Sequence, residues 1–106
     1  MKINYTLCTI ILLLLSIKAT AQVYQVSGRV KEYATLDDLP FVTVKNKSTK
    51  QGAETNKQGF FSIKAQIKDT LEFSFVGYET TRLVINEIKN DIQVVMKKTA
   101  IELNEV

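Results

Sequence analysis

The sequence predicts an all-β protein, a sandwich of about seven antiparallel strands. Apolar residues recur at every second position in short runs, which is the periodicity of a strand with one buried face. Asn, Asp, Gly and Pro residues separate these runs at intervals of about ten residues, as turns do. Helical periodicity after residue 21 is confined to a weak stretch at residues 84–89. Two antiparallel sheets packed face to face are therefore the expected architecture.

Residues 1–21 precede this pattern and have the three parts of a secretory leader. Lys2 lies near the start, an apolar stretch runs from Leu7 to Ile17, and Ala19-Thr20-Ala21 supplies the small-x-small pattern that signal peptidase requires. The apolar stretch is too short for the roughly 20 residues that span a bilayer. We therefore expect cleavage after Ala21 and no transmembrane span in the chain that remains.

Removal of the leader leaves 85 of the 106 residues, enough for one small domain at residues 22–98 and a short tail at 99–106. A chain of this size builds a thin two-layer core, so a deep active-site pocket is not expected. The sequence has no His, and its single cysteine, Cys8, lies in the leader. These counts exclude a Ser-His or Cys-His nucleophile, a His/Cys zinc site and a disulfide from the domain. We expect no enzymatic activity and no cofactor.

The charge balance argues against a nucleic-acid partner. Without the two lysines of the leader, the 14 basic residues fall to 12, against 11 acidic ones. Lys45, Lys47 and Lys50 do cluster, but no aromatic side chain is interleaved with them. Such a cluster is typical of a solvated turn.

Four runs have one apolar and one polar face and are predicted as strands. Two further runs, residues 80–85 and 92–97, have apolar residues on both sides of the alternation, so the sequence leaves their facing open. Residues 52–55 are a candidate for a short edge strand. In chain order, the inward residues of the first four runs are predicted to be Tyr24, Val26 and Val30; Val42 and Val44; Phe61, Ile63 and Ala65; and Leu71, Phe73 and Phe75.

Five residues are predicted to shape the turns between these strands. Pro40 is placed at a strand entrance, where its missing N–H does no harm. Asn56 caps its turn through the side-chain oxygen, and Gly59 adopts a positive φ. Gly77 permits a sharp bend, after which Tyr78 buries its ring.

Four segments, in order and at suitable spacing, carry a family resemblance: 26–30 (VSGRV), 39–44 (LPFVTV), 52–63 (GAETNKQGFFSI) and 71–80 (LEFSFVGYET). Together they resemble the carboxypeptidase regulatory-like domain over about residues 23–98. The resemblance implies a transthyretin-like Greek-key sandwich. Domains of this family are often fused to exported peptidases, or precede the plug of TonB-dependent outer-membrane receptors of Bacteroidota.

The tail and one turn bear on how far this resemblance extends. Residues 100–106 (AIELNEV) resemble the L-[DN]-E-V-V-V segment that leads from this domain into a receptor plug. Only one valine follows here, and no plug or barrel, so transport is not carried over to this polypeptide. Asn56 and Gln58 stand where the family often has acidic residues. The loop at residues 55–59 therefore supplies no carboxylate, and calcium binding is not expected there.

Partner contacts are predicted at one exposed aromatic residue and in the tail. The alternation that buries Phe61 points Phe60 outward, so Phe60 is a candidate for a partner-contact patch. In the tail, Ile101, Leu103 and Val106 are strand-prone and are expected to pair with a sheet edge, on their own domain or on a neighbouring one. The adjacent carboxylates at residues 37 and 38 are assigned a loop role, because neighbours in a loop point apart into solvent.

The expected function is that of an exported, non-enzymatic accessory or docking module at the periplasm or outer membrane. It would bind an envelope protein through its sheet edges and loops. Two alternatives remain. A carbohydrate-binding module would have to use Phe60, Tyr33 and Phe41, since Trp is absent. A spacer domain belonging to a longer receptor or peptidase is the other.

Overall fold

The computed structural model describes residues 3–15 and 22–99. Within these residues it has one helix and seven strands, and every predicted strand run is present. The elements are α1 (Ile3–Leu15), β1 (Tyr24–Glu32), β2 (Thr43–Asn46), β3 (Gly52–Glu54), β4 (Phe60–Ala65), β5 (Thr70–Ser74), β6 (Thr81–Val84) and β7 (Ile92–Met96).

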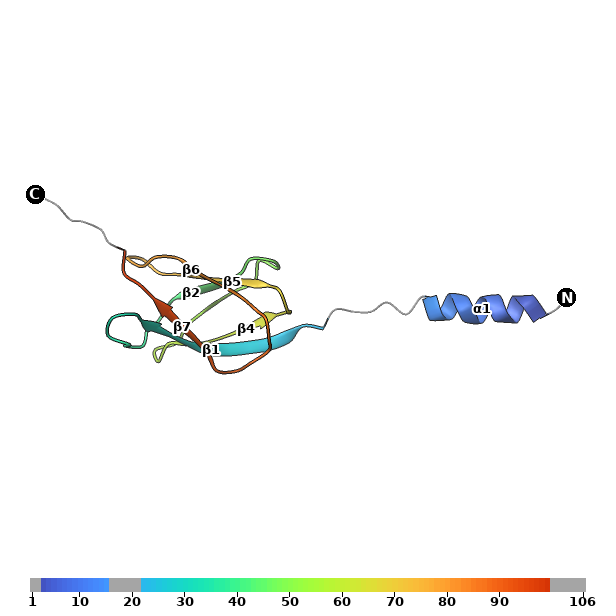
Figure 1. The fold of residues 1–106 in the computed structure, drawn as a ribbon, viewed down its shortest axis with the longest axis horizontal. Helices are drawn as coiled ribbons and strands as arrows, with labels where there is room; N and C mark the ends of the chain where they lie inside the picture. The colour runs from blue at the N-terminus through green and yellow to red at the C-terminus, as the bar shows by residue number, and fades with distance from the viewer. Residues whose placement is uncertain (1–2, 16–21, 100–106) are drawn as a thin grey trace, which may run out of the picture.

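The strands form two sheets that pack face to face, which confirms the predicted fold class (Figure 1). Sheet A has the strand order β4-β1-β7, and sheet B has the order β3-β2-β5-β6. The chain crosses between the sheets from β1 to β2, from β3 to β4, from β4 to β5 and from β6 to β7. Strands distant in sequence therefore become neighbours, and β1 lies at the centre of sheet A.

One pairing differs from the antiparallel arrangement that the sequence predicts. β1 is antiparallel to β4 but parallel to β7, with Arg29 opposite Gln93 and Lys31 opposite Val95. A parallel pair needs a long crossover in place of a tight turn, and here five strands lie between β1 and β7 in the chain. Side chains alternate in the same way in both kinds of ladder, so the residue pattern carries no sign of strand direction.

The core lies between the two sheets and is built from their inward residues. The rings of Phe61 and Phe73, one from each sheet, meet edge to face with 5.1 Å between their centroids. The two runs left open by the sequence are now assigned, because Ile92, Val94 and Met96 face the core from β7, as Leu83 does from β6. The fully buried apolar residues include Val26, Val30, Val42, Val44, Leu71, Phe73 and Met96.

Two of the predicted inward residues are not buried. Tyr24 is 40% exposed, because it pairs with Ala65 at the very end of the β1–β4 ladder, beyond the core. Phe75 follows the last residue of β5 and is only half-buried, packed against the edge of the core. Tyr24 is exposed because β1 extends beyond the core, and Phe75 is only half-buried because β5 ends one residue before it.

A carboxylate, rather than an apolar residue, takes the last inward position of β1. Glu32 is 6% exposed, and its Oε1 accepts hydrogen bonds from the Thr35 N–H and the Thr35 hydroxyl, both at 2.9 Å. Hydrogen bonds from the backbone N–H groups of Thr35 and Ala34 lower the pKa of Glu32 below its ordinary value. The buried side chain therefore remains ionised and organises the loop after β1.

A buried amide links the two sheets at the other end of the sandwich. Asn46 ends β2, and its Nδ2 donates to the backbone oxygen of Lys64 in β4 at 3.1 Å and to Asp69 Oδ2 at 2.9 Å. Its Oδ1 accepts from the Ser48 N–H at 2.9 Å. Burial raises the pKa of Asp69, but the hydrogen bonds from Asn46 and the Gln66 N–H outweigh burial and hold the pKa below its ordinary value.

A buried hydroxyl closes the turn that leads into β2. Thr55 is 1% exposed, and its Oγ1 donates to the backbone oxygen of Leu39 at 2.7 Å and accepts from the Val42 N–H at 2.9 Å. Between these two residues lie Pro40 and Phe41, and the φ of 61° at Phe41 matches a type II turn with Pro in second position. The Thr55 hydroxyl thus replaces the backbone hydrogen bond of this turn.

Helix α1 covers most of the apolar part of the predicted leader. Across residues 3–15 and 22–99, no helix combines the length and the apolar character needed to cross a membrane. The predicted cleavage point after Ala21 lies outside the described residues.

The β1–β7 ladder is tested by adding one methyl group. A Cβ at Gly28 would lie 2.1 Å from the backbone oxygen of Ile92, which is too close for any carbon, so Gly28→Ala must push β7 away from β1. We expect it to cost about 1–3 kcal/mol of unfolding free energy, measured in urea. The matched control is Gly52→Ala, where the nearest atom, the Val44 oxygen, is 3.7 Å away and the change should stay within about 1 kcal/mol. Equal stabilities of the two variants would contradict this contact.

The role of Thr55 is tested by removing its hydroxyl while keeping its shape. Thr55→Val leaves the Leu39 oxygen and the Val42 N–H buried without a partner, so we expect a loss of about 1–3 kcal/mol of unfolding free energy. Thr55→Ser keeps the hydroxyl and should be the more stable of the two variants in urea denaturation. A valine variant as stable as the serine variant would show that this hydroxyl does not hold the turn.

Candidate functional site

The predicted turn residues between β3 and β4 form one hydrogen-bonded loop. Asn56 Oδ1 accepts from the N–H groups of Gln58 at 2.9 Å and Phe60 at 3.0 Å. Gly59 has a φ of 79°, and a Cβ there would meet the Val30 oxygen at 2.7 Å, so this position needs glycine on both counts. All of these contacts lie within the domain, so they give the loop a structural role.

A second group of predicted turn residues lies between β5 and β6. Gly77 has a φ of 87°, and the Tyr78 N–H donates to the Phe75 oxygen at 3.0 Å, which closes the bend. The rings of Phe75 and Tyr78 pack with 5.7 Å between centroids. The backbone of Tyr78 also forms an isolated antiparallel β-bridge with that of Lys98, and the Thr99 N–H donates to the Gly77 oxygen at 2.9 Å. The end of the described domain is thus fastened to this bend.

The structure does not bring the predicted site residues into one cluster. Pro40, Asn56 and Gly59 belong to the loops flanking β2 and β4, whereas Gly77 and Tyr78 lie in the bend after β5. Phe60 is 45% exposed on the outer face of sheet A. The predicted tail contacts Ile101, Leu103 and Val106 lie outside the described residues.

One edge of sheet A, along β4, is partly closed by hydrogen bonds. The Val30 N–H donates to the Gly59 oxygen, which fixes the hydrogen-bonding register of the β1–β4 ladder. The backbone N–H and C=O groups of residues 61 and 63 therefore point toward β1, and those of residues 60, 62 and 64 point toward the outer edge. On that outer edge, Asn56 binds both the N–H and the carbonyl of Phe60, and Asn46 binds the carbonyl of Lys64. Among the described residues of β4, only Ser62 keeps both backbone groups free at the edge.

The opposite edge of sheet A, along β7, is open. The Tyr33 N–H donates to the Met96 oxygen at 2.9 Å, so the backbone N–H and C=O groups of the even-numbered residues of β7 point toward β1. The backbone groups of Gln93 and Val95 therefore point away from the sheet and have no partner within residues 3–15 and 22–99. Beyond them the Lys97 oxygen accepts from the Glu79 N–H at 2.8 Å, which ends the open stretch. This stretch, the backbone edge at residues 93 and 95, is named the β7 edge.

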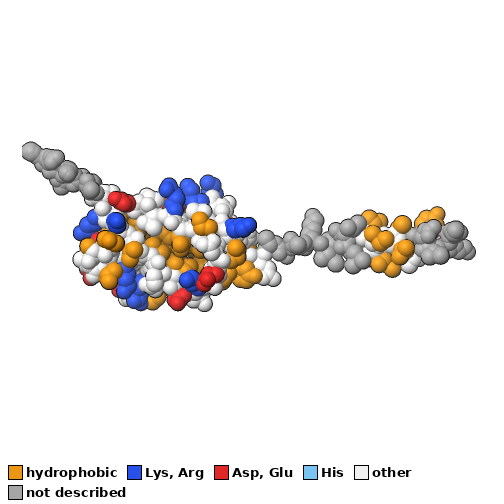
Figure 2. Space-filling model, viewed as in Figure 1, with side chains coloured by type: hydrophobic (Ala, Val, Ile, Leu, Met, Phe, Trp, Pro, Cys, Tyr) orange, Lys and Arg blue, Asp and Glu red, His pale blue; other side chains and the backbone are white. Residues whose placement is uncertain are grey.

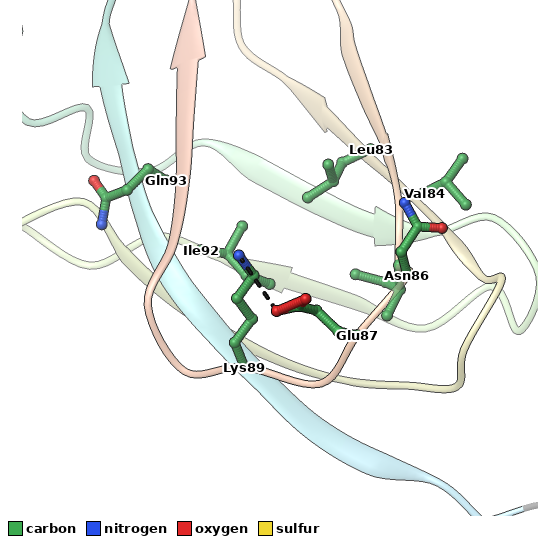
Figure 3. A pocket seen from close by; sticks show the side chains of 8 residues that line it. Leu83, Val84, Asn86, Glu87, Lys89, Ile92 and Gln93 are labelled. Carbon is green, nitrogen blue, oxygen red and sulfur yellow. Dashed lines mark ion pairs between the residues drawn. The ribbon is translucent and has the colours of Figure 1, made fainter.

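A cavity of about 260 Å³ lies beside the β7 edge, between the end of β6 and the start of β7. Leu83 and Ile92 point into the space between the sheets, while Val84 and Gln93 point away from it (Figure 3). In the view of Figure 2, hydrophobic side chains gather across the middle of one face of the sandwich. Leu83 and Ile88 are only partly buried against the core, so the hydrophobic interior is incompletely covered on this side.

Cations lie over two of the three aromatic residues that a sugar site would use. The Arg29 guanidinium carbon is 4.1 Å from the ring centroid of Phe60, and the Lys97 Nζ is 4.6 Å from that of Tyr33. One face of each ring is therefore occupied by a side chain of the same domain. This arrangement does not give the set of bare, coplanar rings that stacks on a sugar.

No charged cluster of the described residues is arranged for metal binding, since no three His, Cys, Asp or Glu side chains gather there. The adjacent carboxylates Asp37 and Asp38 are both exposed. Their backbone groups anchor the loop instead. The Asp37 carbonyl oxygen accepts a hydrogen bond from the Glu32 N–H at 2.8 Å, and the backbone of Asp38 forms an isolated antiparallel β-bridge with that of Lys31. The two residues therefore shape the loop between β1 and β2 through their backbone groups.

Sequence reasoning missed the two residues that define the β7 edge. Gln93 and Val95 fall in a run whose facing was open, and whether their backbone groups are paired depends on which strands flank β7. The only signal available was the exposed β-branched Val95 among polar outward residues, which a sequence cannot distinguish from an ordinary surface valine.

Comparison with solved structures shows the fold alone. A chain of a type II cohesin–X-dockerin complex from Acetivibrio cellulolyticus, an N-terminal interface mutant, superposes with a TM-score of 0.54 at 20% identity, covering 70% of this chain and 57% of that one. The C-terminal interface mutant gives 0.51 at 21% identity, covering 68% and 56%. The group B streptococcus pilus 2b backbone protein gives 0.49 at 11% identity, covering 72% and 41%. This chain thus spans little more than half the length of the first two.

Among curated proteins, no sequence matches this chain. A family match is nevertheless found over most of its length. Residues 26–106 match the CarboxypepD_reg-like domain, in agreement with the resemblance carried by the four sequence segments. The matched region contains all of the two-sheet fold except the first two residues of β1, together with the loop built around Asn56 and Gly59 and the bend at Gly77. This chain belongs to the CarboxypepD_reg-like domain family.

Proposed function

We propose that this chain is a non-enzymatic docking module of a bacterial cell envelope, which binds an extended segment of a partner protein at the β7 edge. Membership in a regulatory-like domain family and a β-sandwich fold support a binding role rather than a catalytic one. The solved structures of similar fold include chains of a cohesin–dockerin complex, an assembly of protein with protein. Strand addition to a sheet edge is a recurrent way for such sandwiches to bind peptides.

The observation that carries this proposal is the difference between the two edges of sheet A. On the β4 edge, Asn46 and Asn56 leave only Ser62 with both backbone groups free, whereas the β7 edge presents two residues with unpaired N–H and C=O groups. An added strand would complete these hydrogen bonds and would give sheet A a fourth strand, as sheet B has. It would also lie beside the partly buried Leu83, so apolar side chains of the partner would cover the exposed rim of the core.

Export is the second element of the proposal. Lys2, the apolar stretch and Ala19-Thr20-Ala21 support delivery to the periplasm or the outer membrane. The family resemblance supports an association with TonB-dependent receptors or exported peptidases. The strand-prone residues Ile101, Leu103 and Val106 support a further possibility for the same edge, in which the tail of a second copy serves as the added strand.

A proline on the β7 edge tests the proposed binding mode. Val95→Pro removes an N–H that points away from β1, so no hydrogen bond of the domain is lost while an incoming strand is blocked. The matched control is Ser62→Pro, the equivalent free position on the β4 edge. We expect proteins captured from envelope extract by the wild-type chain and by Ser62→Pro, identified by mass spectrometry, to be missing with Val95→Pro.

Thermal unfolding of both variants shows whether each proline is tolerated. Capture of the same set of proteins by all three chains would contradict docking at the β7 edge. Equal loss with both prolines at unchanged melting temperature would contradict it as well, because binding would then depend on neither edge in particular.

A further inference from the structure

The outer face of sheet A carries positive charge without compensating acids. Alternation along β1, β4 and β7 fixes which side chains point outward, and three of these nine are cations while none is acidic. Lys97 follows β7 directly and lies over Tyr33 on the same side. Arg29, Lys31, Lys64 and Lys97 are named the basic face. The nine outward residues are Gln25, Ser27, Arg29, Lys31, Phe60, Ser62, Lys64, Gln93 and Val95.

The outer face of sheet B is organised differently, because its cations surround a carboxylate. Glu72 pairs with Arg82 at 2.9 Å and with Lys47 at 3.8 Å, and Lys45 lies opposite Glu72 in the strand register. The remaining ion pair among the described residues joins Lys89 to Glu87 in the β6–β7 loop. No ion pair within residues 3–15 and 22–99 involves the basic face. Positive charge is therefore left uncompensated on one sheet only.

Two cations of the basic face are held in place by aromatic rings. Phe60 positions the Arg29 guanidinium and Tyr33 positions the Lys97 ammonium, but a ring orients a cation without neutralising it. Arg29 Nε is buried and has no acceptor among the described residues. Beside it, a shallow cavity of about 330 Å³ is lined by Arg29, Lys31, Phe60 and Gln93, with Asp91 also at its wall. Asp91 forms no ion pair with Arg29 or Lys31.

We propose that the basic face recognises carboxylates of the partner segment that docks at the β7 edge, an inference that rests on the proposed function. Arg29 lies next to Gln93 and Lys31 next to Val95 in the ladder. A strand added to β7 would point every second side chain outward, beside Gln93, Val95 and Lys97, and about 10 Å from β1, two strand spacings away. Lys31 and a Glu side chain of the added strand are together long enough to span that distance, and Arg29 would leave the Phe60 ring to take part.

The other side chains of the same added strand would face inward, toward Leu83 and Ile88. The partner that fits is therefore an extended segment in which apolar and acidic residues alternate. A planar carboxylate matches the guanidinium of Arg29, which has no carboxylate partner among the described residues. A protein segment is favoured over an anionic membrane, because the cations border an edge that offers directional backbone hydrogen bonds.

The test uses three short peptides of one pattern, VEVEVEV, VQVQVQV and VKVKVKV, with binding measured by calorimetry on the full chain. We expect the glutamate peptide to bind most tightly and the lysine peptide to bind least. Arg29→Gln/Lys31→Gln should weaken the glutamate peptide about 10-fold and leave the glutamine peptide unchanged. The control Lys45→Gln/Lys47→Gln removes the same charge from sheet B and should change neither. Phe60→Ser releases Arg29 from the ring without removing its charge, so it should not weaken binding of the glutamate peptide.

The outcomes separate this inference from the docking proposal. Equal binding of glutamate and glutamine peptides, abolished by Val95→Pro, would keep the β7 edge and overturn the role of the basic face. If Lys45→Gln/Lys47→Gln weakened the glutamate peptide as much as Arg29→Gln/Lys31→Gln did, the role of the basic face would be overturned too, because binding would then depend only on the net charge of the chain. Binding of phosphatidylglycerol vesicles that is lost in Arg29→Gln/Lys31→Gln, with no peptide bound, would assign the basic face to membranes instead. Failure of every peptide and vesicle would overturn both proposals.

Discussion

Strand β1 occupies the centre of sheet A, and its parallel ladder with β7 decides which strand forms one outer edge of that sheet. The ladder requires glycine at position 28, because the Ile92 backbone passes where a Cβ would stand. It also brings β7, the last strand in the described part of the chain, to the outside of the sheet, where no other described strand covers it. If a strand joined to β1 by a hairpin occupied the side of β1 that β7 occupies, β7 could not pair with β1, and the edge at residues 93 and 95 would not form.

Buried polar side chains satisfy backbone groups at three places on the margin of the sandwich. Thr55 completes the turn into β2, Asn46 joins β2 to the outer edge of β4, and Glu32 organises the loop after β1. Each satisfies backbone groups that would otherwise be stranded at the margin of a thin core, which a domain of this size cannot leave unpaired. Among residues 3–15 and 22–99, no comparable side chain binds the backbone of Gln93 or Val95. The open edge, the partly buried Leu83 and the uncompensated charge of Arg29 and Lys31 therefore fall on neighbouring parts of one surface.

Much of the fold follows from the sequence, because burial alternates along β4 and β5 and Asn, Gly and Pro mark the turns between strands. Strand direction does not follow from it, since Val94 faces the core equally well in a parallel or an antiparallel ladder. The inward placement of Glu32 was equally hidden, because its burial depends on hydrogen bonds from a loop. The exposure of Phe60 could be predicted from alternation, but the guanidinium above its ring could not, since that contact joins two strands far apart in the chain.

Amide hydrogen exchange along β7, followed by nuclear magnetic resonance on the full chain, tests the central claim most directly. In a parallel ladder with β1, the N–H groups of Val94 and Met96 are bonded and should exchange slowly, while those of Gln93 and Val95 point outward and should exchange orders of magnitude faster. An alternating pattern of this kind would establish that β7 is paired on one side only and that its edge at residues 93 and 95 is free. Uniform protection of all four amides would show that the edge is already paired, and would contradict the account.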